Sequence, residues 1–356
     1  MTTNTTVRRV VIPKAGSYDR LTFAESAPRE PGRGEVAIEV KGIGVNYADV
    51  IVRMGLYASA KEMVGWPITP GFEVSGVVTA IGPDAADASP DMPALAVGDE
   101  VIACTLFGGY TSHLITQRAY VFKKPANVSF DAAAGVPAVM LTAWYAIHEL
   151  AHPRPGSIAL VHSAAGGVGG SLVQLLKLAG VRVVGVVGGS HKVASAKALG
   201  CDVVIDKSTQ DLWAEAKNAA PAGYDSVYDA NGVETLKASY DHLRRAGKLV
   251  IYGFTTMMPK KGGKPNWFKL AAGFIRTPRF NPLELTNESK SVMAFNLSYL
   301  FDRMDILQPA MNDIEGWLAD GKIQPPPVTT YPFADVAKAH ADIESGKTVG
   351  KLVLIP

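Results

Sequence analysis

The sequence has only two cysteines in 356 residues, and this scarcity argues against two kinds of protein. Cys104 and Cys201 lie far apart, and neither belongs to a CxxC spacing. A disulfide-stapled scaffold needs more cysteines, and a structural zinc site of four thiolates needs four. The seven histidines are also dispersed, with no HExxH pattern. We therefore expect neither a disulfide framework nor a four-cysteine zinc lobe.

Long apolar runs and a strong charge bias are missing as well. The longest weakly charged region, residues 157–189, is interrupted by Lys177, Arg182 and several glycines, whereas a spanning helix needs about 18 apolar residues. Residues 1–14 lack the apolar core of a signal peptide. The formal net charge of +2 is too small to indicate a nucleic-acid partner. We expect a soluble, cytoplasmic protein.

The pattern of the chain changes after its first third. Early segments are short β-branched runs bounded by turn residues, and residues 132–150 read as an apolar helix. From residue 157 onwards, apolar strands alternate with helices, which is typical of βαβ units on a parallel sheet covered on both faces. The expected strands are 34–45, 72–82, 98–103, 110–116, 157–162, 181–188, 202–206, 224–230 and 248–254, and the expected helices of the alternating region are 169–180, 191–200, 211–219 and 234–247. The predicted class is α/β, with a β-rich part followed by a doubly wound parallel sheet.

The C-terminal part returns to helix at residues 313–319 and 335–345 and ends in a strand at 351–356. A late strand after a nucleotide-type domain often returns to the first domain. We therefore expect a discontinuous catalytic domain, residues 1–131 with 295–356, around a nucleotide-binding domain at 132–294.

The sequence VHSAAGGVGGSLVQLL, residues 161–176, is the sharpest motif. It lies where a strand turns into a helix, and its small residues would let the backbone approach a pyrophosphate at the helix N-terminus. The GxGxxG pattern reads over Ala164, Gly166 and Gly169, so alanine replaces its first glycine. The context of five successive strands favours a dinucleotide site over a glycine-rich turn without a ligand.

The loop that follows the second parallel strand bears on the choice of dinucleotide. A cofactor without a 2′-phosphate usually meets an acidic residue there. This chain has Gly188, Ser190 and Lys192, and no acid until Asp202. Serine and lysine would bind a phosphate that a carboxylate would repel. We predict NADPH over NADH, with a solvated Lys192 as the alternative.

Several motifs together resemble a known family over nearly the whole chain. They are GVNYADVIVRMGLY (44–57), PGFEVSG (70–76), AVGDEV (96–101), AAGGVG (164–169) with Gln174, and GKLVLIP (350–356). The chain resembles the zinc-independent medium-chain dehydrogenases/reductases, in the quinone oxidoreductase (zeta-crystallin-like) group. Residues 266–285 and 295–301 resemble the branch named after the synaptic vesicle amine transport protein.

The resemblance implies a GroES-like β-rich catalytic domain, a Rossmann domain and a reactive cleft between them. It also implies NADPH as the hydride donor and a homodimer formed along the sheet edge near residues 248–254. The zinc-dependent relatives carry a cysteine and a histidine where this chain has Asn46 and Phe72. His148 and His152 lie four residues apart without a third ligand nearby, and we expect structural or solvated roles for them. No metal site is expected.

Without a metal, negative charge that develops on a carbonyl oxygen must be stabilised by hydrogen bonds. Tyr57 matches the tyrosine that related enoyl reductases use as a proton donor; the alternative is that it only shapes the pocket. Asn46 matches a family asparagine that contacts the substrate or the nicotinamide amide. Asp49 is expected to cap or solvate the short helix that starts near Asn46. Tyr47 is expected to pack under the cofactor, with a direct role as the alternative.

Further contacts with the cofactor follow from the resemblance, with ordinary packing as the alternative for each. The positions are Asn46, Thr142, Tyr145, Ala165, Gly166, Gly167, Val168, Gly188, Ser190, Lys192, Asn231, Gly253, Phe254, Phe295, Asn296, Leu297 and Lys351. Lys351 precedes the last strand and is expected to reach the phosphate region.

Residues 255–280 form an insert that the core fold does not need. Six cations and four aromatic residues alternate in it without one acidic residue. The insert could be a lid or rim of the cleft, part of a dimer contact, or a weak contact with an anionic membrane.

The sequence therefore predicts an NADPH-dependent reductase of quinones or α,β-unsaturated carbonyls. An enoyl-thioester reductase is the enzyme alternative. A nucleotide-binding regulatory or membrane-associated protein with little turnover is the alternative of another class.

Overall fold

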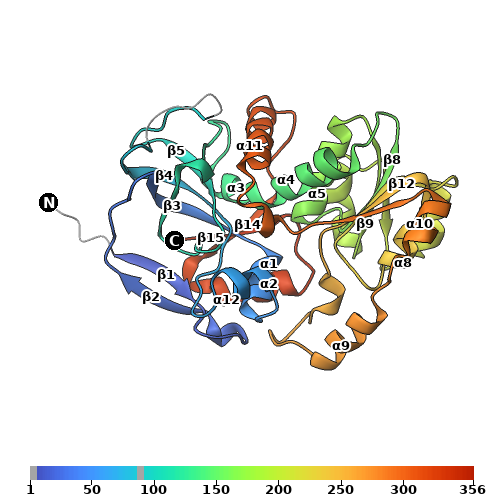
Figure 1. Ribbon diagram of the computed structural model, residues 1–356, viewed down its shortest axis with the longest axis horizontal. Coiled ribbons are helices and arrows are strands. Elements are labelled where there is room, and N and C mark those ends of the chain that lie inside the picture. Colours follow the sequence, from blue (N-terminus) through green and yellow to red (C-terminus); the bar gives the residue numbers. More distant parts are fainter. Residues whose placement is uncertain (1–5, 86–91) are drawn as a thin grey trace.

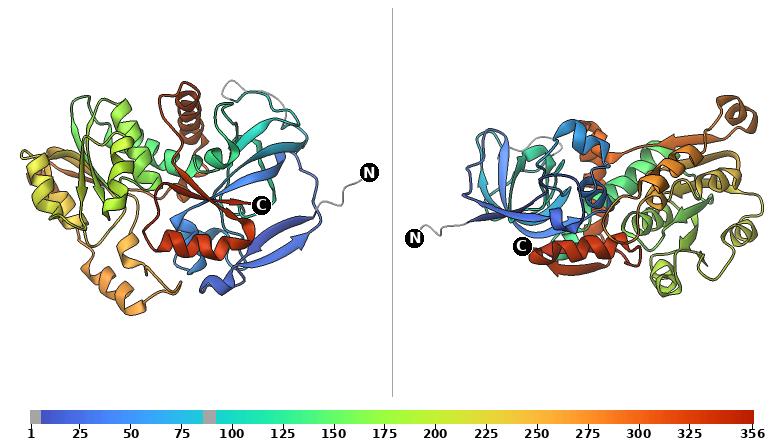
Figure 2. Two further views of the ribbon diagram at one scale, coloured as in Figure 1. Left: turned by 180° about the vertical axis from the view of Figure 1, so that it is seen from behind. Right: turned by 90° about the horizontal axis from the view of Figure 1, so that it is seen from below.

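Two β-sheets organise the chain, and they form the cores of two lobes that lie side by side along the long axis (Figure 1). The computed structural model describes residues 6–85 and 92–356. Figure 2 shows the same two lobes from behind and from below, with the C-terminus on the lobe that the first part of the chain builds.

The first sheet is built from both ends of the sequence. Its order is β14-β15-β3-β4-β5-β7, and β6 also pairs with β3. Its strands are β3 (Glu35–Val45), β4 (Glu73–Ile81), β5 (Glu100–Cys104), β6 (His113–Gln117), β7 (Val121–Lys123), β14 (Val328–Pro332) and β15 (Lys351–Ile355). The pairing of Leu352 with Val45 joins the last strand to β3 in antiparallel register. A separate hairpin, β1 (Val7–Val11) with β2 (Thr22–Ser26), lies on the same lobe (Figure 1).

The second sheet has six strands, all parallel, in the order β10-β9-β8-β11-β12-β13. Its strands are β8 (Ile158–His162), β9 (Arg182–Val187), β10 (Val203–Asp206), β11 (Tyr224–Asp229), β12 (Leu243–Ile251) and β13 (Ser291–Ala294). Because β8 is central and the chain winds first towards β10 and then towards β13, the strand order reverses between β8 and β11. This arrangement confirms the predicted α/β class with a doubly wound sheet.

Helices cover the sheets and connect the lobes. They are α1 (Tyr47–Arg53), α2 (Ala58–Met63), α3 (Phe130–Ala134), α4 (Pro137–Trp144), α5 (Gly167–Leu178), α6 (Val193–Ala198), α7 (Leu212–Ala219), α8 (Leu236–Asp241), α9 (Trp267–Arg276), α10 (Pro282–Glu288), α11 (Met304–Ala319) and α12 (Val336–Glu344). The short 3-10 turns are η1 (Tyr18–Arg20), η2 (Arg118–Tyr120), η4 (Ser190–Lys192), η5 (Thr255–Met257), η6 (Leu297–Leu300) and η7 (Phe333–Asp335).

Two expected helices are divided or shortened. The apolar stretch 132–150 becomes α3, α4 and the π-helix η3 (Tyr145–Ala151), and Pro137 begins α4, since proline has no N–H and fits the first turn. The helix expected at 234–247 ends at Asp241, and β12 begins at Leu243. Leu243 pairs with Tyr224, and the register then shifts around a left-handed Ala246. Parallel pairing with β11 therefore overrides helix propensity there.

Apolar side chains fill three buried clusters, one on each face of the parallel sheet and one around the first sheet. The largest includes Met140, Leu172 and Met311, so α4, α5 and α11 pack together between the two sheets. Among the residues that the structure describes, no helix is both long and apolar enough to cross a bilayer. The insert at 255–280 packs little and contains α9, which lies apart at the bottom of Figure 1.

Candidate functional site

One edge of the parallel sheet collects most of the predicted cofactor positions. Because all six strands are parallel, the segments after them leave at the same edge. The segments are 163–166 after β8, Gly188 after β9, Asn231 after β11, Gly253 and Phe254 after β12, and Phe295 to Leu297 after β13. The central pair, β8 and β11, marks the point where open α/β sheets bind ligands.

The turn between β8 and α5 has the shape that a diphosphate needs. Ser163 adopts a left-handed φ of 56°, and Gly166 is the N-cap of α5. A Cβ on Gly169 would lie 2.1 Å from the carbonyl oxygen of Ser163, so only glycine allows this approach. The first-turn amides of α5, on Gly167 and Val168, have no acceptor within the helix. With the helix dipole they could bind phosphate oxygens.

The chain's last strand begins against this turn. The Gly350 N–H donates to the Ala165 carbonyl at 2.9 Å. The side chain of Lys351 then runs past the turn, with its Cδ 3.2 Å from the position that a Cβ on Gly167 would take. Residues from the two sheets therefore meet at the candidate phosphate site.

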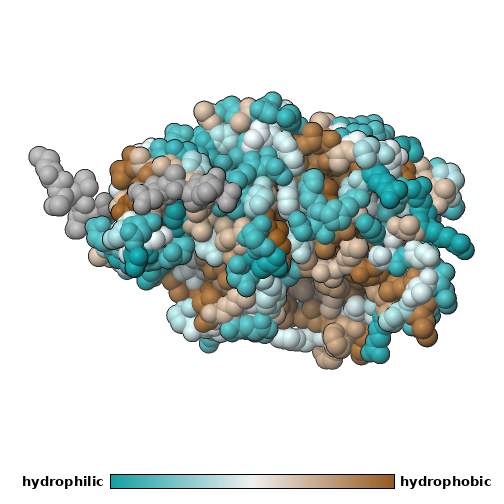
Figure 3. All heavy atoms as spheres, turned by 45° about the horizontal axis from the view of Figure 1, so that its top comes forward, coloured by the Kyte–Doolittle hydropathy of each residue, from teal (hydrophilic) through white to brown (hydrophobic). Residues whose placement is uncertain are grey.

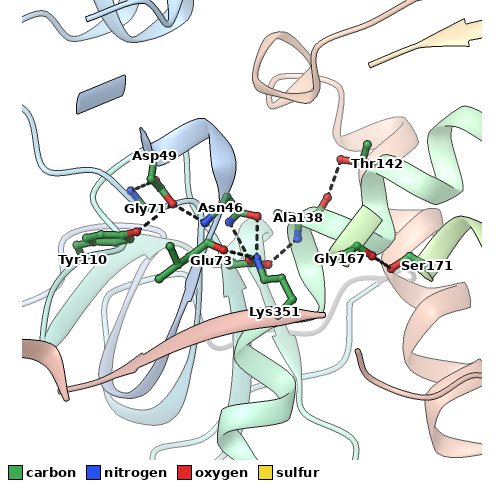
Figure 4. A network of polar contacts seen from close by, with 11 residues as sticks. Asn46, Asp49, Gly71, Glu73, Tyr110, Ala138, Thr142, Gly167, Ser171 and Lys351 are labelled. Carbon is green, nitrogen blue, oxygen red and sulfur yellow. Dashed lines mark hydrogen bonds and ion pairs between the residues drawn. The ribbon is translucent and has the colours of Figure 1, made fainter. Parts of the chain in front are cut away.

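The ammonium of Lys351 enters a buried polar cluster of the first sheet (Figure 4). It donates to Glu73 Oε1 at 2.6 Å, to Asn46 Oδ1 at 2.7 Å and to the Val45 carbonyl at 3.0 Å. Lys351 is 3% exposed and Glu73 is fully buried. Glu73 Oε2 accepts from the Ala138 N–H in α4 at 2.7 Å. The Lys351 ammonium was expected to reach the phosphate region. It is instead directed at Glu73, because the buried carboxylate attracts it.

Asn46 is fixed by this ion pair and by the helix that it begins. Its Oδ1 accepts from Lys351, and its Nδ2 donates to Glu73 Oε1 at 2.8 Å. Its N–H donates to Asp49 Oδ2 at 2.8 Å, so Asp49 caps α1 as expected. Asp49 is buried and also accepts from the Gly71 N–H and the Tyr110 hydroxyl. Burial raises the pKa of Asp49 to about 7, although these hydrogen bonds act to lower it.

Tyr57 is half-buried and lies on the same lobe, at the N-cap of α2. Its hydroxyl donates to Asn296 Oδ1 at 2.8 Å, in the segment after β13. Asn296 Oδ1 also accepts from the N–H and the hydroxyl of Ser298. The Tyr57 ring meets Phe72 and Phe107 edge-on, with centroids 5.9 and 6.3 Å apart. Burial raises the pKa of Tyr57, which keeps its proton on the oxygen.

The region after β9, where the 2′-phosphate is expected, contains the predicted Ser190 and Lys192 and two residues that the sequence did not reveal, Asp206 and Lys207. Ser190 donates to Asp206 Oδ2 at 2.5 Å, and Lys192 donates to the Gly346 carbonyl at 2.7 Å. The loop after β9 has no acid of its own, but the strand order brings Asp206, at the end of β10, beside the end of β9. The hydroxyls of Ser190 and Ser208 lower the pKa of Asp206 and occupy its carboxylate.

Lys207, beside Asp206, is the other missed residue. Its Cε lies 3.9 Å from the position of a Cβ on Gly188. Burial, and then the charge of Lys207, lower the pKa of Lys192. The parallel strand order was the signal that could have placed Lys207 there.

The remaining candidates have simpler surroundings. The Thr142 hydroxyl donates to the Ala138 carbonyl at 2.6 Å, within its own helix. Tyr145 stacks on Phe295 with centroids 4.8 Å apart. The Asn231 N–H donates to Asp229 Oδ1 at 2.8 Å. His148 stacks beside Trp144 and Trp317, and His152 is exposed. The side-chain amide of Gln174 pairs with the backbone of Gln324. Tyr47 is half-buried.

Within residues 6–85 and 92–356, no three His, Cys, Asp or Glu side chains are grouped so that they could hold a metal ion. Where the zinc-dependent relatives place ligands, this chain has an amide, Asn46, and an aromatic ring, Phe72. The ammonium of Lys351 lies beside that amide.

Comparison with known proteins gives concordant matches. Residues 32–128 match the alcohol dehydrogenase GroES-like domain, and residues 199–354 match a family described as zinc-binding dehydrogenase. The synaptic vesicle membrane protein VAT-1 homolog of Danio rerio is 32% identical over 98% of this chain and 70% of the relative. The 2-haloacrylate reductase of a Burkholderia species is 29% identical over 98% of this chain and 99% of the relative. The structure of Escherichia coli quinone oxidoreductase complexed with NADPH has a TM-score of 0.82 and 28% identity, over 98% of this chain and all of that one.

We predict that Glu73 and Lys351 stabilise the fold as a pair. Glu73→Gln or Lys351→Met alone leaves one buried charge without its partner and should lower the free energy of unfolding by about 3–5 kcal/mol. The double variant should lose clearly less than the sum of the two losses. Urea denaturation of the four proteins measures these values, and additive losses would contradict the pairing.

Proposed function

This chain belongs to the medium-chain dehydrogenase/reductase family, in its quinone oxidoreductase group, and from that premise we propose that it is an NADPH-dependent reductase of quinones or α,β-unsaturated carbonyls that works without zinc. The observation that carries the proposal is the meeting of the glycine-rich turn at Gly166 with Lys351, which leads directly to Asn46. A nucleotide bound at that turn would extend towards the segment Asn46–Tyr57. The E. coli structure with NADPH and the Burkholderia acrylate reductase support the cofactor and the acceptor class.

The residues at the sheet edge fit NADPH. The first turn of α5 would bind the diphosphate, and Ser190, Lys192 and Lys207 would bind the 2′-phosphate. The ammonium groups of Lys192 and Lys207 would balance the charge of the Asp206 carboxylate, which accepts from Ser190 and Ser208. When bound, the nicotinamide supplies the hydride, and the protein orients it and tunes the charge around it.

Tyr57 would donate the proton that completes the reduction. Hydride addition leaves negative charge on the acceptor oxygen, and a fixed hydroxyl can stabilise it or transfer a proton to it. The Tyr57 hydroxyl keeps its proton and donates it to Asn296, which a substrate oxygen could replace as the acceptor. The edge-on rings of Phe72 and Phe107 make the surroundings of Tyr57 apolar, which suits a flat, apolar acceptor.

The donor set supports a reaction without catalytic zinc. A zinc ion needs thiolate, imidazole or carboxylate ligands, and the position beside Glu73 already holds the Lys351 ammonium. A second cation beside Glu73 would be repelled by that ammonium. Asn46, with both ends of its amide engaged, is then a positioning group for the segment rather than a ligand.

We also propose the domain division 1–131 with 295–356 against 132–294, and a homodimer. The pairing of β15 with β3 supports the division, although residue 131 lies within α3. The sheet edge expected near residues 248–254 is not an edge, since β13 pairs with β12 there. The proposed dimer contact is therefore the free side of β13, where backbone groups are available to a second copy.

Oxidation of NADPH with a panel of quinones, enones and enoyl thioesters tests the proposal. Turnover of quinones or simple enones is expected. Selective turnover of enoyl thioesters would favour that alternative instead. Binding of NADPH without turnover of any acceptor would favour a regulatory, nucleotide-binding protein.

We predict that Tyr57→Phe lowers turnover by about 10²–10³ and leaves the NADPH dissociation constant nearly unchanged, because only the proton donor is removed. Steady-state kinetics and a fluorescence titration with NADPH measure the two effects. Tyr299→Phe is a matched control, since its hydroxyl bonds Glu62 at the surface. Wild-type turnover in Tyr57→Phe would remove the proton-donor role.

Lys192→Gln should weaken NADPH binding about tenfold or more, because a charge-assisted contact with the 2′-phosphate is lost. Binding of NADH, which lacks that phosphate, should change little. Calorimetric titration with both nucleotides measures this, and the exposed Lys197→Gln on α6 is the control. An equal loss for the two nucleotides would mean that Lys192 does not contact the 2′-phosphate.

A second role, weak peripheral contact of a cytoplasmic protein with anionic membranes, is favoured by α9. Trp267, Phe268, Phe274 and Ile275 are 68%, 91%, 77% and 77% exposed, among the insert's cations. Such a combination can insert apolar rings between lipid headgroups while the cations meet anionic lipid. Figure 3 shows brown, apolar atoms exposed along the lower part of one face of the molecule.

We predict that the protein cosediments with vesicles of phosphatidylserine and phosphatidylcholine more than with phosphatidylcholine alone. Phe268→Ser with Phe274→Ser should abolish the difference, because these rings would be the inserted groups. Leu283→Ser, at a 74% exposed position on α10, is the control and should bind as the wild type does. Equal sedimentation with both vesicle types would contradict the membrane role.

A further inference from the structure

The insert is fixed to the opposite lobe at one buried residue. Gly263 is the only buried residue between 259 and 266, and its neighbours Gly262 and Lys264 are exposed. The Gly263 N–H donates to Glu344 Oε1 at 3.0 Å, and its carbonyl accepts from Arg53 Nη2 at 3.3 Å. Both polar groups of this one peptide residue are therefore bound by a charged pair of the first lobe.

The pair that holds Gly263 is itself enclosed. Arg53 and Glu344 are fully buried and form an ion pair at 3.0 Å. The Tyr18 hydroxyl donates to Glu344 Oε2 at 2.9 Å, and the Arg53 guanidinium lies 4.4 Å from the Tyr18 ring centroid. Buried charges are costly unless they are paired and hydrogen-bonded, and the Gly263 backbone supplies one acceptor to Arg53 and one donor to Glu344.

Glycine is required at this contact. Gly263 has a φ of 65°, in the left-handed region. A Cβ there would lie 2.7 Å from Ser17 Oγ and 3.0 Å from the Tyr18 ring. Gly262, its neighbour, has a φ of 83° but nothing within 4 Å of a built Cβ. The two glycines therefore share the backbone requirement, and only Gly263 also requires the absence of a side chain.

The other end of the insert is attached at the cofactor edge. The Thr255 N–H donates to the Ala230 carbonyl at 3.0 Å, and Thr256 donates to the Asn231 carbonyl through its N–H at 2.9 Å and its hydroxyl at 2.8 Å. The insert thus follows β12, is held beside the turn after β11, reaches the first lobe at Gly263 and then forms α9 (Figure 1).

The contact at Gly263 is continuous with the candidate active site. Arg53 is the last residue of α1, and Asn46 is the N-cap of the same helix. Arg53 Nη1 also lies 3.4 Å from His340 Nδ1, and His340 Nε2 lies 3.1 Å from the Tyr110 hydroxyl, which bonds Asp49. A displacement of Gly263 would therefore be transmitted through Arg53 to α1 and to Asn46 at its other end.

We infer that residues 255–266 are a strap that joins the two lobes, and that Arg53 and Glu344 are positioning residues that fasten it at Gly263. While fastened, the strap holds α1 and the turn at Asn231 at one separation and so retains a nucleotide lying between them; this last part rests on the proposed function. Unfastening should let the lobes separate and the nucleotide leave faster.

Native-state trypsin digestion of Gly263→Ala, with Gly262→Ala as the matched control, tests the strap. The substituted Cβ should unfasten the loop only in Gly263→Ala and raise cleavage after Lys260 and Lys261 about tenfold or more, because cleavage follows local opening. Both variants should keep the wild-type melting temperature within a few degrees. Equal cleavage rates in the two variants would overturn the proposal.

The same two variants report on nucleotide retention. Gly263→Ala should raise the NADPH dissociation rate about threefold or more in stopped-flow fluorescence, and Gly262→Ala should leave it unchanged. If the wild type does not bind NADPH, the proposed cofactor is wrong, while the digestion still decides the strap. If Gly263→Ala does not fold, hydrogen exchange on the wild type decides: the Gly263 amide should exchange at least about tenfold more slowly than those of Gly262 and Lys264, and equal rates would overturn the strap.

Discussion

The buried ion pair between Glu73 and Lys351 is the interaction on which the arrangement of the site depends. It joins residues 278 positions apart in the sequence. Removing two charges from water is costly, and the pair is stable only because its other hydrogen-bonding groups are satisfied. Asn46, the Val45 carbonyl and the Ala138 N–H supply those bonds. One pair thus fixes the last strand, the end of β3 and the start of α4 in a single geometry.

The consequences reach the parallel sheet. Because Lys351 begins β15 and its side chain passes Gly167, the first lobe is placed directly against the turn that would hold a diphosphate. Asn46 is held at both ends of its amide, so α1 leaves the cluster in one direction and carries Arg53 to the insert. Tyr57 meets Asn296, in the segment that leaves the parallel sheet after β13. The proposed chemistry follows from this placement: a hydride donor on one side of the cleft and a hydroxyl on the other, with hydrogen bonds in place of a metal.

The sequence predicted what local patterns determine. The β8–α5 turn, the alternation of strands and helices and the capping role of Asp49 all depend on residues close together in the chain. Contacts that depend on the tertiary arrangement were not predictable in this way. The direction of the Lys351 ammonium depends on Glu73, and the approach of Asp206 and Lys207 to Ser190 depends on strand order. The fastening of Gly263 needs Arg53 and Glu344 from two distant segments. The prediction of one helix over 234–247 is wrong because the pairing of β12 with β11 overrides the local helix propensity.

An ammonium and a fixed asparagine lie beside the buried Glu73 carboxylate, and we propose that reduction proceeds by NADPH without zinc. The most direct test measures metal content and NADPH–quinone turnover on one sample, before and after treatment with a strong chelator. The account predicts no stoichiometric zinc and the same turnover after chelation. One zinc per chain, with turnover lost on its removal and restored by its return, would contradict it.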